Sequence, residues 1–146
     1  MPNNKKVIPS SQSGLWTFYD WVDGDGSNPI EKWLAEQSNE VQMTFNSMLK
    51  EARKRRNYFD WPCFRHKMNG KPGSEGAYEL GFKADGRQYR LLVKFDGELQ
   101  TVILCGCFHK GGNYTPTNAL ETTVKPARAL AQGKASRRER TIQDDL

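Results

Sequence analysis

The fold of this chain is decided by residues Ala77–Pro116, which read AYELGFKADGRQYRLLVKFDGELQTVILCGCFHKGGNYTP. Two Asp-Gly steps, Asp85-Gly86 and Asp96-Gly97, divide the stretch into three apolar-rich runs. Asp-Gly between alternating runs is a strong hairpin signal, because glycine accepts a positive φ at low steric cost. In the middle run every second residue from Tyr89 to Phe95 is apolar, which is the period of a half-buried strand. We therefore predict an antiparallel three-stranded meander with one face on a core.

The other face of the middle strand carries cations. Alternation places Arg90 and Lys94 on this face, opposite the apolar side chains. The last strand of the meander delivers His109, Lys110 and Tyr114 close to its end. This is the only place where the chain gathers chemically active side chains, and we expect the functional site there.

The segments before the meander indicate one strand and two helices. The aromatic run Gly14–Val22 favours a strand, and Asn28-Pro29 has the N-cap and N1 residues that open a helix. A second helix is predicted over Glu40 to about Asn57. Its basic end, with Lys54 and Arg55, either complements the helix C-terminus or contacts nucleic acid.

Two further segments complete the expected domain. The turn-rich segment Tyr58–Ser74 is read as an exposed basic loop that carries Arg65, His66 and Lys67. Thr117–Gln132 has helical periodicity, and Pro126 should kink that helix or split it.

The fold class expected from this order is α+β. The N-terminal strand and the meander form an antiparallel sheet, two N-terminal helices pack on one face, and a C-terminal helix follows. Residues 1–13 are predicted to be a flexible arm, 14–132 a single domain and 133–146 a polar flexible tail.

The net charge of the chain indicates which partners it can bind, and its cysteines indicate the cellular compartment. The 146 residues carry a net charge of +5, which suits nucleic acid, an acidic protein or an anionic surface. No apolar run approaches the roughly 20 residues of a membrane span, and the N-terminus lacks the apolar core of a secretory signal. Three cysteines without an export signal fit a reducing cytoplasm, where we expect the protein to be. We interpret Cys105 and Cys107 as small core residues rather than metal ligands.

Several landmarks together resemble the phage-derived branch of the RelE/HigB-like toxins of type II toxin–antitoxin systems. The likeness covers most of residues 15–116 and includes the following elements: Phe18-Tyr19, the helix around Ile30, Trp33 and Leu34, Glu79-Leu80, Tyr89-Arg90-Leu91, Phe108-x-Lys110 and Thr115-Pro116. The resemblance implies a small sheet-and-helix endoribonuclease that cuts mRNA in the ribosomal A site. It also implies a cognate antitoxin protein as partner.

Two positions depart from the family pattern. Gly81 stands where the family usually has an arginine, and Gly111 stands where it usually has a second lysine. The loss of this arginine and this lysine favours an alternative function. In that alternative, the protein is a ParE-like or inactivated relative that binds a topoisomerase or an antitoxin without cutting RNA. A basic accessory protein that binds nucleic acid without cleavage is a third hypothesis.

The available side chains fit RNA cleavage without a metal ion. No carboxylate cluster or His/Cys spacing indicates a metal, so we predict neither a metal site nor a cofactor. Arg90, which matches the family arginine, is predicted to hold the phosphate, and His109 to move a proton. Lys110 would add charge, and Tyr114 would stack on a base or donate a proton. The remaining candidates for RNA binding are Lys94, Arg87, Arg65, His66, Lys67, Lys54 and Arg55.

Overall fold

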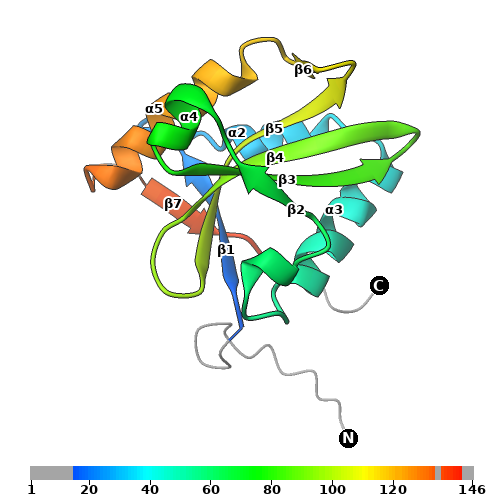
Figure 1. Cartoon of the computed structure of the whole chain (residues 1–146), viewed down its shortest axis with the longest axis horizontal. Helices are drawn as coiled ribbons and strands as arrows, with labels where there is room; N and C mark the ends of the chain where they lie inside the picture. The colour runs from blue at the N-terminus through cyan, green and yellow to red at the C-terminus, as the bar shows by residue number, and fades with distance from the viewer. Residues whose placement is uncertain (1–14, 134–135, 143–146) are drawn as a thin grey trace, which may run out of the picture.

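The computed structural model describes residues 15–133 and 136–142 and contains one seven-stranded sheet with helices on both faces (Figure 1). The strand order is β2-β3-β4-β5-β1-β7, and β6 pairs with β5. The strands are β1 Thr17–Val22, β2 Phe64–Lys67, β3 Ala77–Ala84, β4 Arg87–Phe95, β5 Gln100–Lys110, β6 Asn113–Thr115 and β7 Ser136–Glu139. The helices are α2 Pro29–Ala35, α3 Asn39–Ala52, the 3-10 turn η1 Tyr58–Asp60, α4 Gly70–Ser74 and α5 Ala119–Ala131.

The α+β class and the meander are confirmed. Strands β3, β4 and β5 pair antiparallel in sequence order, and β4 begins directly after the Asp85-Gly86 turn. Both turn residues have positive φ, 55° and 73°, as a two-residue hairpin loop requires. The expected all-antiparallel sheet is wrong in one place, because β1 pairs with β5 in parallel. This inner position lets β1 bury Phe18 on one face and Trp21 on the other, which an edge strand would leave exposed.

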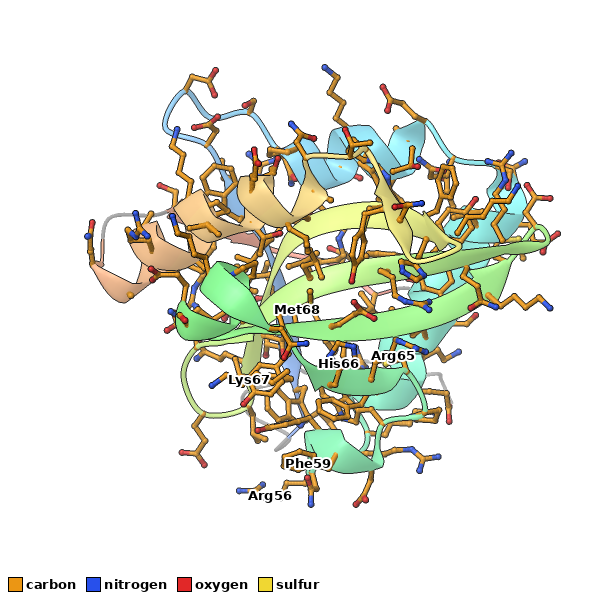
Figure 2. All side chains as sticks on the ribbon, turned by 45° about the horizontal axis from the view of Figure 1, so that its top comes forward. Arg56, Phe59, Arg65, His66, Lys67 and Met68 are labelled. Carbon is orange, nitrogen blue, oxygen red and sulfur yellow. The ribbon has the colours of Figure 1, made fainter. Side chains whose placement is uncertain are left out.

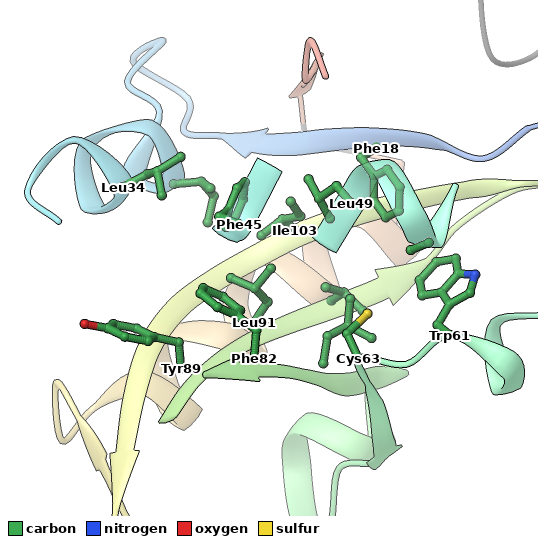
Figure 3. Packing of buried hydrophobic residues seen from close by; sticks show 14 of the residues in the cluster. Phe18, Leu34, Phe45, Leu49, Trp61, Cys63, Phe82, Tyr89, Leu91 and Ile103 are labelled. Atoms are coloured by element: carbon green, nitrogen blue, oxygen red, sulfur yellow. The ribbon is translucent and has the colours of Figure 1, made fainter. Parts of the chain in front are cut away.

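One face of the sheet is covered by α2 and α3, which supply the larger core (Figure 3). Phe45 and Leu49 of α3 belong to the same buried cluster as Tyr89, Leu91 and Val93 of β4. Our prediction that these three β4 side chains are buried beneath α3 is therefore confirmed. The helices start where the caps indicated: the Asn28 side chain accepts from the backbone N–H of Glu31, and Ser38 caps α3 in the same manner.

The opposite face is divided into an apolar half and a polar half. Helix α5 covers the apolar half, where Leu92, Val102 and Leu104 are buried with Ala127. The rest of the face, which we call the polar half, carries Glu79 and Arg90 and is not covered by α5. Pro126 was expected to kink or split this helix, but α5 runs as one helix from Ala119 to Ala131.

The segment 136–140 of the predicted tail is part of the fold. Ser136–Glu139 forms β7 and pairs antiparallel with β1. Beyond it, Arg140 Nε and Nη2 donate to the two oxygens of Asp20 at 2.8 and 2.6 Å. The Asp20 side chain is 3% exposed, so its charge needs this partner. The predicted arm, residues 1–13, lies outside the described residues, and α3 ends at Ala52 rather than near Asn57.

Candidate active site

A buried carboxylate lies at the centre of the polar half. The side chain of Glu79, on β3, is 3% exposed and contacts four other side chains. Its Oε2 lies 3.0 Å from Arg90 Nε, accepts from Arg65 Nε at 2.9 Å and lies 3.7 Å from His66 Nε2. Its Oε1 accepts from the Tyr114 hydroxyl at 2.6 Å. We call these five residues the Glu79 cluster.

A β-bulge in β2 brings two members of the cluster to Glu79. Phe64 pairs with Leu80 and His66 with Glu79, so two residues of β2 lie opposite one step of β3. A bulge of this kind turns consecutive side chains toward one face, and it is common beside functional sites. Arg65 and His66 therefore both reach the carboxylate; Figure 2 shows them next to each other on β2. The segment was predicted to be a loop, and the correction is that Arg65, His66 and Lys67 lie on this edge strand.

Gly81 leaves the space that the two arginines occupy. A Cβ atom at this position would lie 2.6 Å from Arg65 Cδ and 2.9 Å from Arg90 Nη1. Real Cβ atoms do not approach so closely, so a larger residue would displace the guanidinium groups. Gly81 therefore lacks the arginine that the family usually has here, and the side chains of Arg65 and Arg90 from the two neighbouring strands fill this space instead.

Gly111 serves the turn that returns Tyr114 to the site. Gly111 and Gly112 have φ values of 58° and 84° and form the two-residue loop between β5 and β6. Positive φ at both positions is characteristic of a tight hairpin and favours glycine over lysine. Because Lys110 pairs with Asn113, the short strand β6 carries Tyr114 back toward Glu79. The second departure from the family pattern is therefore required by the hairpin.

Arg90 lies on the predicted face but is not exposed. Its side chain is 6% exposed, and Nη1 donates to the backbone carbonyl of Tyr89 at 3.1 Å. The approach of Nε to Glu79 is an ion pair whose direction is too bent for a good hydrogen bond. Arg65, whose side chain is 45% exposed, is the guanidinium of the pair that solvent and ligands reach first.

The protonation states in the cluster follow from its geometry. Burial, and secondly the hydrogen bond to Glu79, raise the pKa of Tyr114 above its ordinary value, so the hydroxyl keeps its proton at neutral pH. His66 Nδ1 lies 2.9 Å from the carbonyl oxygen of Lys67, which can only accept. Nδ1 is therefore the donor of this hydrogen bond, and Nε2 is the nitrogen that faces Glu79.

His109 and Lys110 lie beside the cluster rather than in it. The His109 ring centre is 4.9 Å from that of Tyr114. Both residues line a hollow of about 650 Å³, together with Arg87 from the start of β4. Lys110 and Arg87 are exposed and add positive charge at this end of the sheet. Strand alternation puts them on the same face as Phe108 and Tyr89, so they lie toward the α2/α3 side rather than on the polar half.

Four predicted RNA contacts lie elsewhere. Lys94 is on the expected face, but its Nζ donates to the carbonyl of Ala127 in α5 at 3.2 Å. Lys54 pairs with Glu51 of the preceding helix α3 at 3.6 Å, and Arg55 follows in the turn after that helix. Lys67 is exposed at the end of β2. The structure therefore groups Arg65, His66, Arg90 and Tyr114 directly and places His109 against Tyr114, while Lys110 and Arg87 lie at the same end of the sheet.

Glu79 is the residue that sequence reasoning missed as part of the site. The signal was available, because alternation in Ala77–Ala84 sets Glu79 opposite the apolar residues Tyr78, Leu80 and Phe82. A glutamate on the same sheet face as Arg90, one strand away, is a natural ion-pair partner.

The fold and the cluster define a class: a small mixed α+β protein with more cationic than anionic groups on one half of a sheet face. The chain matches the family model described as phage derived protein Gp49-like (DUF891) over residues 32–126, and it belongs to that family. Neither the search of curated proteins nor that of solved structures returned a match.

The described part of the chain was searched for metal-ligand clusters and for membrane-spanning helices. Within residues 15–133 and 136–142, no three His, Cys, Asp or Glu side chains gather as metal ligands. No helix in these ranges is both long enough and apolar enough to cross a membrane. The cysteines Cys63, Cys105 and Cys107 are buried and unpaired, as expected for core residues.

Proposed function

We propose that this protein is the toxin of a type II toxin–antitoxin system and acts as a ribosome-dependent, metal-independent mRNA endoribonuclease. The observation that carries the proposal is the Glu79 cluster, in which one carboxylate is matched by two guanidinium groups. The excess charge is positive, and a phosphate diester supplies the missing anion. Membership of a phage-derived family and the resemblance to RelE/HigB-like toxins support the same function.

The proposed mechanism assigns phosphate binding to the arginines. Arg65 meets the scissile phosphate from solvent, and Arg90 adds charge from behind it. Glu79 is a positioning residue, because it contacts both guanidinium groups at Nε. Arg65 then presents its terminal nitrogens to phosphate oxygens, whereas Arg90, whose Nη1 donates to the Tyr89 carbonyl, acts through its charge. Charge that develops on the pentacoordinate phosphate is stabilised by groups already in place, which is the largest single contribution in many enzymes.

Proton transfer is assigned to a histidine. Removal of the 2′-hydroxyl proton and protonation of the 5′-oxygen both need a group that titrates near neutral pH. His109 flanks Tyr114 on the hollow side, and His66 lies on the other side of Glu79. Tyr114 keeps its proton, so it orients Glu79 instead of acting as a base. Lys110 contributes charge beside His109.

The site supplies charge and histidines for proton transfer, and RNA cleavage also needs the strand held in line. A ribosome would supply this alignment by presenting mRNA in the A site, which fits ribosome-dependent cutting. A cytoplasmic location follows from that substrate. We also propose a cognate antitoxin with an acidic segment that covers the Glu79 cluster and the cations around it.

Induced expression in cells, followed by mapping of mRNA 5′ ends, tests the proposal. The expected result is growth arrest with new 5′ ends inside translated reading frames, and rescue by the product of an adjacent antitoxin gene. Healthy growth with abundant, folded protein would contradict the toxin function. Growth arrest without new 5′ ends would contradict the nuclease.

The last outcome would favour a protein-binding toxin or an inactive relative. One observation supports that second candidate: Arg90 is 6% exposed, and Glu79 is satisfied by partners within the chain. Buried and fully paired charges can be purely structural. In that case the exposed cations Arg65 and Lys110 would contact an acidic partner protein instead of RNA.

A further inference from the structure

The end of the sheet next to the Glu79 cluster is hollowed. The Asp85-Gly86 turn joins β3 to β4, and the Gly111-Gly112 turn joins β5 to β6. Figure 1 shows these two hairpin tips as separate projections from the same end of the sheet. The hollow of about 650 Å³ lies between them, within the range of small-ligand sites. It is lined by Asp85, Gly86, Arg87, Gln88, Phe108, His109, Lys110 and Gly111.

The walls of the hollow suit a flat, polar-edged ring. The guanidinium carbon of Arg87 lies over the Phe108 ring at 5.1 Å from its centre, so a planar cation rests on an aromatic support. Arg87 is exposed, and its outer face is open to a ligand. Planar guanidinium groups and aromatic rings are the surfaces on which proteins stack unpaired bases. Gln88 adds an amide that can both donate and accept at a base edge.

The hollow is connected to the Glu79 cluster through two of its own lining residues. Gln88 Oε1 lies 3.5 Å from Arg90 Nη1. The His109 ring packs on Tyr114, whose hydroxyl donates to Glu79. Gln88 and His109 face the polar half, whereas Arg87 and Phe108 lie toward the α2/α3 side of the same sheet end. RNA with a phosphate at the Glu79 cluster would therefore pass between the hairpin tips, around the end of the sheet, to place a neighbouring base on Arg87.

We infer that this hollow is a nucleobase subsite, in which a base of single-stranded RNA next to the scissile phosphate stacks on Arg87. The inference rests on the proposed function for the identity of the ligand, and it deepens that function by assigning the base contact to the inter-hairpin hollow. Binding at the subsite combines a stacking plane with the charge of Lys110. Inorganic phosphate uses only the charge.

Titration of the full-length protein with nucleoside 5′-monophosphates and with inorganic phosphate, followed by NMR of labelled protein, tests the inference. Nucleotides should shift the amide signals of Gly86 and Gly111 and bind more tightly than phosphate. Arg87→Ala should weaken nucleotide binding about tenfold and phosphate binding by less, since it removes a stacking partner for one base as well as a charge.

A conservative variant separates stacking from charge. Arg87→Lys keeps the positive charge but removes the plane, so it should weaken nucleotide binding much as Arg87→Ala does. Arg138→Ala, an exposed arginine on β7 at the other edge of the sheet, is the matched control and should bind like wild type. Wild-type affinity in Arg87→Lys, or equal affinity for nucleotide and phosphate, would overturn the subsite.

The two proposals fail in different ways. The titrations require no cleavage. Base binding in the hollow by a protein that cuts no RNA would therefore contradict the nuclease function but support the nucleobase subsite. Cleavage of mRNA by the protein, together with normal nucleotide binding by its Arg87 variants, would contradict the nucleobase subsite but support the nuclease function.

Discussion

Replacing Glu79 by glutamine should destabilise the protein far more than an ordinary charge removal does. The amide keeps the shape of the carboxylate but loses its charge, and its NH₂ group faces the arginine donors. Arg90, 6% exposed, would then be a buried cation without a counter-ion, which typically costs 3–5 kcal/mol. Arg65 adds little to this sum, because its side chain is 45% exposed.

Urea unfolding followed by circular dichroism measures the effect. With a slope of about 2 kcal/mol per molar urea, Glu79→Gln should lower the midpoint by about 2 M. Glu75→Gln is the matched control: Glu75 pairs with Arg128 at 3.0 Å, but the two side chains are 22% and 54% exposed. Its loss should stay below about 1 kcal/mol.

A double variant distinguishes an unpaired charge from general loss of packing. Glu79→Gln combined with Arg90→Met removes both buried charges, and it should recover part of the lost stability. Equal midpoint shifts for Glu79→Gln and Glu75→Gln would refute the buried ion pair. A double variant that is weaker than the sum of its single changes would also contradict it.

The remaining predictions concern the tail, the thiols and the glycine under the arginines. Arg140→Ala should cost about 3–5 kcal/mol in urea unfolding, because it leaves the carboxylate of Asp20 buried without its counter-ion, although Asn28 Nδ2 still donates to it. Burial raises the pKa of Cys63 to about 12, so about 10⁻⁴ of this thiol is ionised at pH 8, and a disulfide reagent should label it only after unfolding. Gly81→Ala should reduce RNA cleavage by tenfold or more with a smaller loss of stability, since the new Cβ displaces Arg65 from the phosphate position; unchanged cleavage would contradict this placement.

Local signals in the sequence were sufficient for most of the framework. The Asp85-Gly86 hairpin, the Asn28 cap and the burial of alternate β4 residues all depend on short-range chemistry, and the structure confirms them. The position of β1 was not predictable in this way. Its parallel pairing with β5 joins residues about 80 positions apart, and no local pattern specifies it.

The site was only partly predictable for the same reason. Alternation placed Arg90 on the correct face, but its partner Glu79 is also held by Tyr114 and Arg65, which come from other strands. The bulge that turns Arg65 and His66 toward Glu79 depends on pairing with β3, and the segment alone reads as a loop. Arg140 in the polar tail gave no sign of its pairing with Asp20, because charged residues near a chain end are usually solvated.

The central claim, that the Glu79 cluster cuts mRNA, is tested most directly by primer extension on mRNA in translating ribosomes. Wild type, Arg90→Ala and the control Arg138→Ala are compared after circular dichroism has verified that each is folded. Wild type and Arg138→Ala should cut equally, and Arg90→Ala about a hundredfold more slowly, as expected for the loss of one transition-state charge contact of about 3 kcal/mol. Equal cleavage by wild type and Arg90→Ala, or no cleavage by folded wild type, would contradict the claim.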